Sequence, residues 1–106
     1  MSEQQVLVPE VAEMFKLMGD PSRLGILVAC LDGPASVGEI ALRLSLSPSL
    51  VSHHLRLLRA ARLVKAERRG KQVFYAIDDH HIEQIVIDML AHAAEEAGAE
   101  ARKDVA

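Results

Sequence analysis

The sequence predicts a mainly helical protein with one small β-hairpin, and three observations support this fold class. Apolar residues recur at helical spacing over most of the chain. Residues that typically begin a helix precede several of these stretches. Residues 63–77 are instead rich in β-branched and aromatic side chains. A chain of 106 residues has room for one domain. We expect residues 1–106 to form a single domain, with an ordered core at residues 10–97 and a flexible tail at residues 98–106.

The first two helices are expected on either side of Asp20. Apolar side chains within residues 9–19 are three and four positions apart, which predicts a helix over this range. Asp20 is a typical N-cap residue, and Pro21 favours the first helical position. A second apolar stripe follows and ends at Gly33. Cys30 lies on or beside this stripe, which indicates a buried thiol rather than a reactive one.

A helix-turn-helix is expected over residues 36–60. Ser36 is a typical N-cap residue, and Glu39 three positions later completes a capping box. Ser47 followed by Pro48 begins another short helix after a polar turn. Two short helices joined by such a turn are typical of the helix-turn-helix motif.

A β-hairpin, which we call the wing, is expected next. The composition of Leu63–Glu67 and of Gln72–Ile77 predicts two strands. Residues 68–71, Arg-Arg-Gly-Lys, separate them and place three cations at the tip. Gly70 permits the positive φ that a tight hairpin turn needs.

The last helix is expected to begin beside Asp79 and to end near Ala97. Asp78 and Asp79 offer an N-cap and negative charge, and both are favourable at a helix start. An apolar stripe follows over residues 82–93, and Gly98 is expected to end the helix. The order helix, helix, helix-turn-helix, hairpin, helix is that of a winged helix-turn-helix.

The net charge of −3 hides an uneven distribution of charge. Between Ile40 and Ile77 the chain has eight basic residues and one acidic residue, Glu67, so this segment carries +7. The remainder of the chain carries −10. A basic centre between acidic ends is the electrostatic pattern of a nucleic-acid-binding surface. The alternative is a solvated basic face without a partner.

Composition excludes several classes of protein. The single cysteine rules out an intrachain disulfide and a cysteine-cluster metal site. No apolar run approaches the ~18 residues that span a bilayer. Residues 1–9 lack the basic and apolar segments of a secretory signal. We therefore expect a soluble protein of the cytoplasm, with no membrane partner and no small-molecule substrate.

Double-stranded operator DNA is the expected partner, because the second helix of a helix-turn-helix contacts base edges in the major groove. Here the N-terminal end of that helix has hydroxyl and imidazole side chains, which donate to or accept from base edges and phosphates. Cations on the wing suit an adjacent minor groove or the backbone. The candidate DNA-binding residues are Ser47, Ser49, Ser52, His53, His54, Arg56, Arg68, Arg69 and Lys71. The alternative is that the serines only cap the helix and the histidines are ordinary surface residues.

Four residues of the last helix are metal-competent: Asp79, His81, His92 and Glu95. His81 and His92 are eleven residues apart, about 16 Å along a helix, so one ion cannot contact both within one chain. Two antiparallel copies of the helix would bring Asp79 and His81 of one chain to His92 and Glu95 of the other. The homodimer would then hold two equivalent sites, each with a donor set that suits Zn(II). The alternative is that Asp79 only caps the helix and Glu95 is solvated.

Three segments resemble the ArsR/SmtB family of bacterial metal-responsive repressors. They are residues 47–58 (SPSLVSHHLRLL), residues 63–75 with the Arg-Arg-Gly-Lys wing, and the Asp-His-His-Ile run at residues 79–82. The resemblance covers residues 10–97, and it implies a homodimer that holds an operator when metal-free and releases it when metal binds. In the zinc-sensing branch, Asp-x-His precedes His-x-x-Glu or His-x-x-His by ten residues on the C-terminal helix. The four candidate ligands match this pattern position by position.

The resemblance also narrows the choice of metal ion. Family members with cysteine ligands place them in the helix before the recognition helix, and residues 39–46 have no cysteine. Nickel- and cobalt-sensing relatives recruit ligands from their tails, and residues 96–106 have no histidine, which favours four-coordinate zinc. Pro48 stands where a polar residue is common in the family, so one base contact is expected to differ.

The resemblance further implies an allosteric connector. In the family, the histidine that matches His92 donates to a backbone carbonyl just beyond the recognition helix, and by position that carbonyl belongs to Arg62. Three alternatives stay open: a regulator that responds to cobalt, cadmium or nickel, a regulator that responds to no metal, and a metalloenzyme. Four protein ligands argue against the enzyme, because catalytic zinc keeps an open position. We therefore expect no enzyme. His80 is an alternative to His81 as the ligand.

Overall fold

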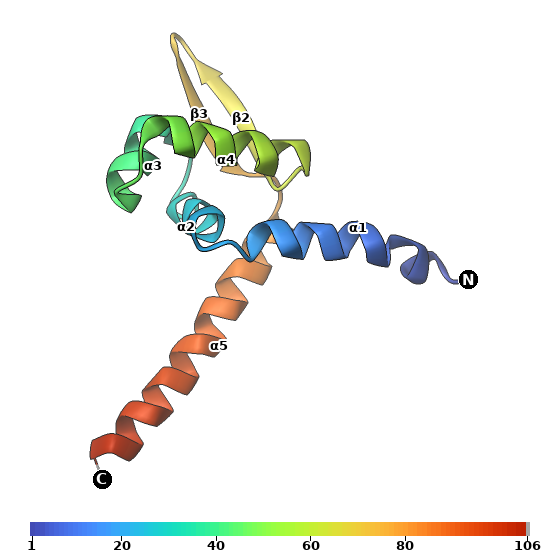
Figure 1. The fold of residues 1–106 in the computed structure, drawn as a ribbon, viewed down its shortest axis with the longest axis vertical. Helices are drawn as coiled ribbons and strands as arrows, with labels where there is room; N and C mark the ends of the chain where they lie inside the picture. The colour runs from blue at the N-terminus through green and yellow to red at the C-terminus, as the bar shows by residue number, and fades with distance from the viewer. Residues whose placement is uncertain (106) are drawn as a thin grey trace.

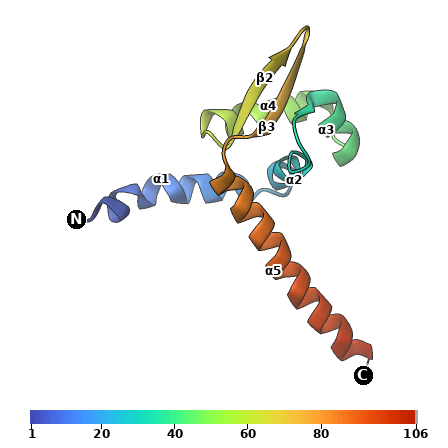
Figure 2. The same ribbon diagram turned by 180° about the vertical axis from the view of Figure 1, so that it is seen from behind.

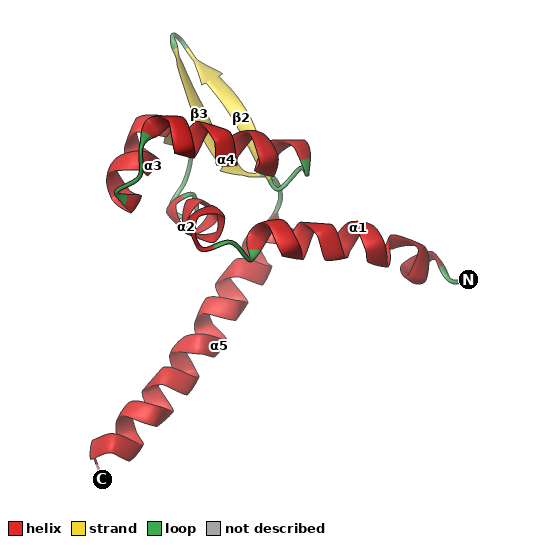
Figure 3. Cartoon of the chain, viewed as in Figure 1, coloured by secondary structure: helices red, strands yellow, loops and turns green. Residues whose placement is uncertain are grey.

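The computed structural model describes the backbone of residues 1–105 and the side chains of residues 1–98. The helices are α1 (Glu3–Met18), α2 (Pro21–Ala29), α3 (Val37–Leu44), α4 (Pro48–Ala60) and α5 (His80–Val105). The strands are β1 (Ala35–Ser36), β2 (Val64–Arg69) and β3 (Gln72–Ile77). This mainly helical arrangement with a small antiparallel sheet confirms the predicted fold class (Figures 1 and 3).

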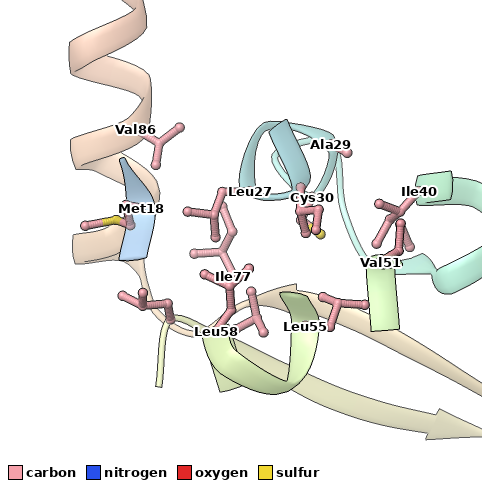
Figure 4. Packing of buried hydrophobic residues seen from close by; sticks show 14 of the residues in the cluster. Met18, Leu27, Ala29, Cys30, Ile40, Val51, Leu55, Leu58, Ile77 and Val86 are labelled. Carbon is pink, nitrogen blue, oxygen red and sulfur yellow. The ribbon is translucent and has the colours of Figure 1, made fainter. Parts of the chain in front are cut away.

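One apolar core lies between α2, α3, α4 and the sheet, and we call residues 20–79 the head. The largest fully buried side chains are Ile26, Leu27, Ile40, Val51, Leu55, Leu58, Leu63 and Val64. Met18 at the end of α1 and Val86 in α5 close this core at one edge (Figure 4). Burial of this many aliphatic side chains is the main force that holds α4 against the rest of the head.

The sheet has three strands in the order β1-β3-β2, all antiparallel. Arg69 pairs with Gln72, so Gly70 and Lys71 alone form the hairpin turn. Gly70 has a φ of +63°, as the sequence predicts. β2 therefore runs further than expected and includes the first two cations of the wing. Strand β1 was not predicted, because two residues have no periodic pattern; it forms where the chain before α3 pairs with β3.

Helix α1 begins at Glu3 rather than at residue 9, so the prediction of its start is wrong. The Oγ of Ser2 accepts from the backbone N–H of Gln5 at 3.2 Å, and the side chain of Gln5 accepts from the backbone N–H of Ser2 at 3.0 Å. This capping box starts the helix before the expected core of residues 10–97. Pro9 lies inside the helix, where it cannot donate to the carbonyl of Gln5.

Helix α5 continues past Gly98 to Val105, so the predicted stop is also wrong. One glycine costs a helix only about 1 kcal/mol relative to alanine, and alanine and glutamate, which favour helix, surround it here. Residue 106 and the side chains of residues 99–106 lie outside the described residues. The flexibility of residues 98–106 therefore stays a prediction.

Helices α1 and α5 extend from the head as two arms in different directions (Figures 1 and 2). Beyond Val86, every α5 residue up to Ala97 is exposed. The radius of gyration is 16.1 Å, whereas a compact domain of this length has about 13 Å. Within residues 1–105, no helix combines the length and apolar character needed to cross a membrane.

Candidate DNA interface and metal centre

Helix α4 begins at the cap that the sequence predicts. Ser47 is extended, and its Oγ accepts from the backbone N–H of Leu50 at 3.1 Å. Pro48 follows at a position where a helix needs no N–H donor. Between α3 and α4, Ser45 adopts the left-handed conformation with a φ of 55°. The turn and the cap together set the direction in which α4 leaves α3.

One face of α4 is buried and the other is exposed. The buried residues are Val51, His54, Leu55 and Leu58. The exposed and half-buried residues of the opposite face are Ser49, Ser52, His53 and Arg56. Each set follows the spacing of three and four residues that defines one side of a helix. The exposed face presents hydroxyl, imidazole and guanidinium groups to solvent, which are the groups that read base edges and phosphates in a major groove.

His54 differs from the other candidate DNA-binding residues of α4, because it is only 9% exposed and faces the interior of the head. Its contact with DNA stays a prediction that this placement does not favour. Its Nδ1 lies 3.5 Å from the Nη1 of Arg23 on α2. Burial lowers the pKa of His54, the Asp20 carboxylate opposes this change, and the charges of Arg23 and His53 reinforce it. The sequence does contain the signal for burial, because His54 falls within the apolar spacing of α4.

The wing presents the three predicted cations, and all three are exposed. Arg69 is held in place: its Nη2 lies 3.2 Å from Oε2 of Glu67, and its guanidinium carbon lies 5.2 Å from the centre of the Phe74 ring. The side chains of Arg68 and Lys71 make no hydrogen bond or ion pair within the part of the chain that the structure describes. The wing therefore combines one oriented cation with two that are free to adjust to a phosphate backbone.

Asp79 and His81 form the first half of the candidate metal centre. The Oδ1 of Asp79 accepts from the backbone N–H groups of His81 at 2.9 Å and of Ile82 at 3.2 Å, so Asp79 caps α5. The hydrogen bond from Ile82, followed by that from His81, holds the pKa of Asp79 below its ordinary value against desolvation. The same Oδ1 lies 3.5 Å from the Nδ1 of His81. Two ligands of a tetrahedral zinc ion, with bonds of ~2.0 Å, are about 3.3 Å apart. The two donor atoms therefore have a spacing that fits one ion.

His92 and Glu95 form the second half, one turn apart on the exposed part of α5. Within one protomer, the described side chains include no group of three or more His, Cys, Asp or Glu residues that could hold a metal ion. Helix geometry explains this result, because the two halves are separated by three turns of α5. A complete four-ligand centre requires a second copy of the chain.

The predicted connector is not assembled in one protomer. Arg62 lies directly beyond α4 in the left-handed conformation, with a φ of 59°, and its side chain lies 3.5 Å from the Glu10 carboxylate of α1. Among the described residues no hydrogen bond joins His92 to Arg62. Helix α5 leads away from the end of α4 (Figure 1). A contact between His92 and the carbonyl of Arg62 stays a prediction for the dimer.

The two arms expose apolar side chains around a groove of about 310 Å³ where α1, α2 and α5 meet. Met89 is 60% exposed, Phe15 50% and Leu90 43%, and all three line the groove with the half-exposed Leu24. An apolar surface that extends over three helices is unusual for an isolated soluble domain and marks an interaction surface. Helix α5 contributes both to this groove and to the predicted metal centre.

Comparisons with known proteins identify the family of the chain. Residues 20–66 match the family described as bacterial regulatory protein, arsR family. The transcriptional repressor SmtB of Mycobacterium tuberculosis is 35% identical over 91 residues, which are 86% of this chain and 67% of that protein. The homodimeric winged helix-turn-helix domain Mb0332 of Mycobacterium bovis superposes with a TM-score of 0.82 at 26% identity, covering 92% of this chain and 91% of that one. The cadmium sensor CmtR of Mycobacterium tuberculosis superposes with a TM-score of 0.65 at 42% identity, covering 73% and 80%.

A helix-turn-helix with an exposed polar recognition face and a cationic wing defines a winged helix-turn-helix protein of the DNA-binding class. Its relatives are transcriptional regulators of this fold and not enzymes. The chain belongs to the arsR family of bacterial regulatory proteins.

Proposed function

We propose that this protein is a homodimeric transcriptional repressor of the cytoplasm that binds operator DNA when metal-free and releases it when Zn(II) binds. The observation on which this proposal rests is the donor pair of Asp79 and His81, 3.5 Å apart at the start of α5. His92 and Glu95 lie further along the same helix, on a part that the rest of the chain leaves exposed. The similarity to the repressor SmtB and to the cadmium sensor CmtR supports the proposal.

The apolar groove of the arms is where we expect the dimer to form. Burial of Phe15, Met89 and Leu90 against a second copy would remove exposed apolar surface of both arms from water. The homodimeric state of the similar Mb0332 domain supports this arrangement. If the two α5 helices pack antiparallel, the symmetry of the dimer creates two equivalent four-ligand sites.

DNA binding is assigned to the exposed face of α4 and to the wing. Ser49, Ser52 and His53 occupy the part of α4 that enters a major groove, and Arg56 follows at a position suited to phosphate. In a dimer, two such helices read two half-sites about 34 Å apart, or a multiple of this distance. His54 is buried and is not part of this surface.

Two imidazoles and two carboxylates suit zinc, and zinc bound there would join the two α5 helices. Release of DNA requires a coupling free energy, typically ~1–3 kcal/mol, and DNA then weakens zinc binding by the same amount. His92 can provide the coupling, because a ligating imidazole usually donates its second ring N–H to a nearby acceptor. The carbonyl of Arg62, at the end of α4, is the acceptor that we propose. Orientation of His92 would then act on the end of α4 and change the spacing of the two recognition helices.

Titration of the metal-free protein with Co(II), followed by visible absorption, tests the metal centre. We expect intense tetrahedral bands that saturate at one ion per chain, because two protomers share two sites. His92→Ala should abolish these bands, whereas the control variant His53→Ala, which removes an exposed histidine outside the site, should leave them unchanged. Zinc should also release the wild type from DNA but not His92→Ala.

Other outcomes would contradict specific parts of the proposal. Weak octahedral bands of Co(II) would indicate a site with additional ligands, and the proposed effector would then be a metal other than zinc. The absence of any Co(II) binding, together with DNA binding that neither zinc nor EDTA changes, would leave a winged-helix regulator that responds to another signal.

A further inference from the structure

Arg23 connects two helices of the head, α2 and α4, with the arm α1. Its Nε donates to the carbonyl of Leu17 in the last turn of α1 at 2.7 Å. Its Nη1 lies 3.5 Å from the Nδ1 of His54 on α4. Its backbone N–H donates at 3.0 Å to the carboxylate of Asp20, which caps α2. One half-buried side chain therefore contacts an arm of the molecule and the helix assigned to DNA recognition.

The contact with Arg23 favours one protonation state of His54. A guanidinium group only donates hydrogen bonds, so a hydrogen bond across this 3.5 Å contact needs an Nδ1 that accepts. That form of His54 is the neutral imidazole with its proton on Nε2, and burial, which lowers the pKa of His54, favours the same form. Protonation would place a second donor and a second positive charge 3.5 Å from Arg23, in a position that is 9% exposed. Among the described residues, the charges that act on His54 are that of Asp20, which raises its pKa, and those of Arg23 and His53, which lower it. The Asp20 carboxylate already accepts the backbone N–H of Arg23.

The contacts of Arg23 with Leu17 and His54, which we call the bridge, join an arm to the helix assigned to DNA recognition. The carbonyl of Leu17 is one of the last four of α1 and has no partner inside its own helix. Arg23 supplies that partner and reaches α4 with the same side chain. The arms carry the surface that we assign to the dimer, and α4 carries the surface that we assign to DNA. A contact between α1 and α4 therefore affects the angle at which the dimer presents its recognition helices.

We propose that Arg23 is a positioning residue for operator binding, which orients α4 relative to α1 through its contact with the neutral imidazole of His54. This inference rests on the proposed function as a DNA-binding dimer. It adds a proton-dependent contact to a repressor whose proposed effector is a metal ion, and it uses a histidine that is not a candidate metal ligand.

The pH dependence of this bridge follows from the chemistry. Because the pKa of His54 is lowered in the folded chain, the folded state binds fewer protons than the unfolded state as the pH falls below the ordinary histidine value. The neutral form and its bridge are complete above that value. As the pH falls, protonation opposes the folded arrangement and weakens the contact with Arg23. Operator affinity should therefore fall from about pH 8 to about pH 5, although the positive charge that exposed histidines gain over this range by itself favours binding to DNA.

The test compares Arg23→Gln with Arg43→Gln as a matched control. Arg43 also donates from its guanidinium to a backbone carbonyl, that of Ala29, at 2.9 Å, but it contacts neither α1 nor α4 through a hydrogen bond. Both variants lose one positive charge, so the general electrostatic loss is shared. The DNA probe is a duplex selected from a random-sequence library by the metal-free wild type. We expect Arg23→Gln to weaken binding about tenfold relative to Arg43→Gln, a factor that corresponds to ~1.4 kcal/mol.

His54→Gln provides the second measurement. Its side-chain oxygen can accept from Arg23 but cannot be protonated in this range. At about pH 8 we expect this variant to bind the selected duplex within about twofold of wild type. Toward about pH 5 its affinity should not show the fall that we expect for wild type. Circular dichroism and sedimentation would confirm that each variant is folded and dimeric.

The outcomes separate this inference from the proposed function. If wild type binds a selected duplex but Arg23→Gln binds it as tightly as Arg43→Gln, the positioning role is wrong and the repressor proposal stands. If Arg23→Gln does not fold, an unchanged pH profile in His54→Gln overturns the inference. If wild type selects no duplex at all, both proposals fail.

Discussion

Adjacent residues with the same side chain can have opposite roles, as His53 and His54 show. His53 is exposed on the face of α4 assigned to DNA, whereas His54 is buried against Arg23. A rotation of 100° per residue around a helix is enough to separate them. Histidine has no decisive preference for surface or core, so composition does not distinguish the two positions. The spacing of the neighbouring apolar residues does, because His54 shares the stripe of Val51 and Leu55.

Cys30 permits a prediction at the same scale. It is buried, and desolvation raises its pKa to about 11, although the charge of Arg43 opposes this change. At about pH 8 we expect a thiol reagent to label the native chain at least ~100-fold more slowly than the chain unfolded in guanidinium, because the thiolate is the reactive form. Because the folded chain holds the thiol proton more tightly, the contribution of Cys30 to the free energy of unfolding should be lost as the pH rises above the ordinary pKa of cysteine. Since the chain has one cysteine, the labelling rate reports this site alone. Equal rates in the native and unfolded chain would contradict the buried assignment.

The helices of the head begin where local signals place them. Asp20, Ser36 and Ser47 each accept a hydrogen bond from the backbone N–H three residues later, as the sequence predicts. Helix ends are less clearly marked, and Gly98 did not end α5. The difference has a physical reason. A cap supplies a hydrogen bond at a defined position, whereas a glycine removes only a modest amount of helix stability.

Removal of the cap of α4 should therefore have a measurable cost. We expect Ser47→Ala to lower the free energy of unfolding by about 1 kcal/mol, because the backbone N–H of Leu50 loses its acceptor. Ser49→Ala is the matched control, since Ser49 is also exposed in the first turn but caps nothing; its cost should stay within about 0.5 kcal/mol. Urea denaturation followed by circular dichroism measures both values. Equal costs for the two variants would mean that the cap does not stabilise α4.

The whole molecule has one compact head and two arms that lack a complete partner surface. The head buries its large aliphatic side chains, while Met89 and Phe15 on the arms remain at least half exposed. The large radius of gyration has the same origin, because the arms extend from the head instead of packing on it. In the proposed dimer, a second copy of the chain covers this apolar surface and completes the predicted metal centre.

A charge placed in the groove of the arms should prevent this association. We expect Met89→Glu to shift the protein from dimer to monomer in sedimentation equilibrium, because a buried unpaired carboxylate costs several kcal/mol. Leu42→Glu is the control: Leu42 is 84% exposed on α3 and does not line the groove, so this variant should remain dimeric. A dimer that survives Met89→Glu would place the interface on another surface.

The sequence by itself determined the order of the elements, the caps of the head, the cationic wing and the donor pattern of the last helix. The caps and the wing depend on residues within a few positions of one another, and the donor pattern depends on spacing along one continuous helix, so the spacing of residues in the sequence is sufficient to predict these features. Only the tertiary structure decided that His54 is buried, that β1 joins the sheet and that α5 leaves the head beyond Val86. Each of these depends on residues far apart in the chain that become neighbours when the core forms. The three and four residue spacing of α4 separates its two faces, but the contact with Arg23 on α2 exists only once both helices pack on the same core.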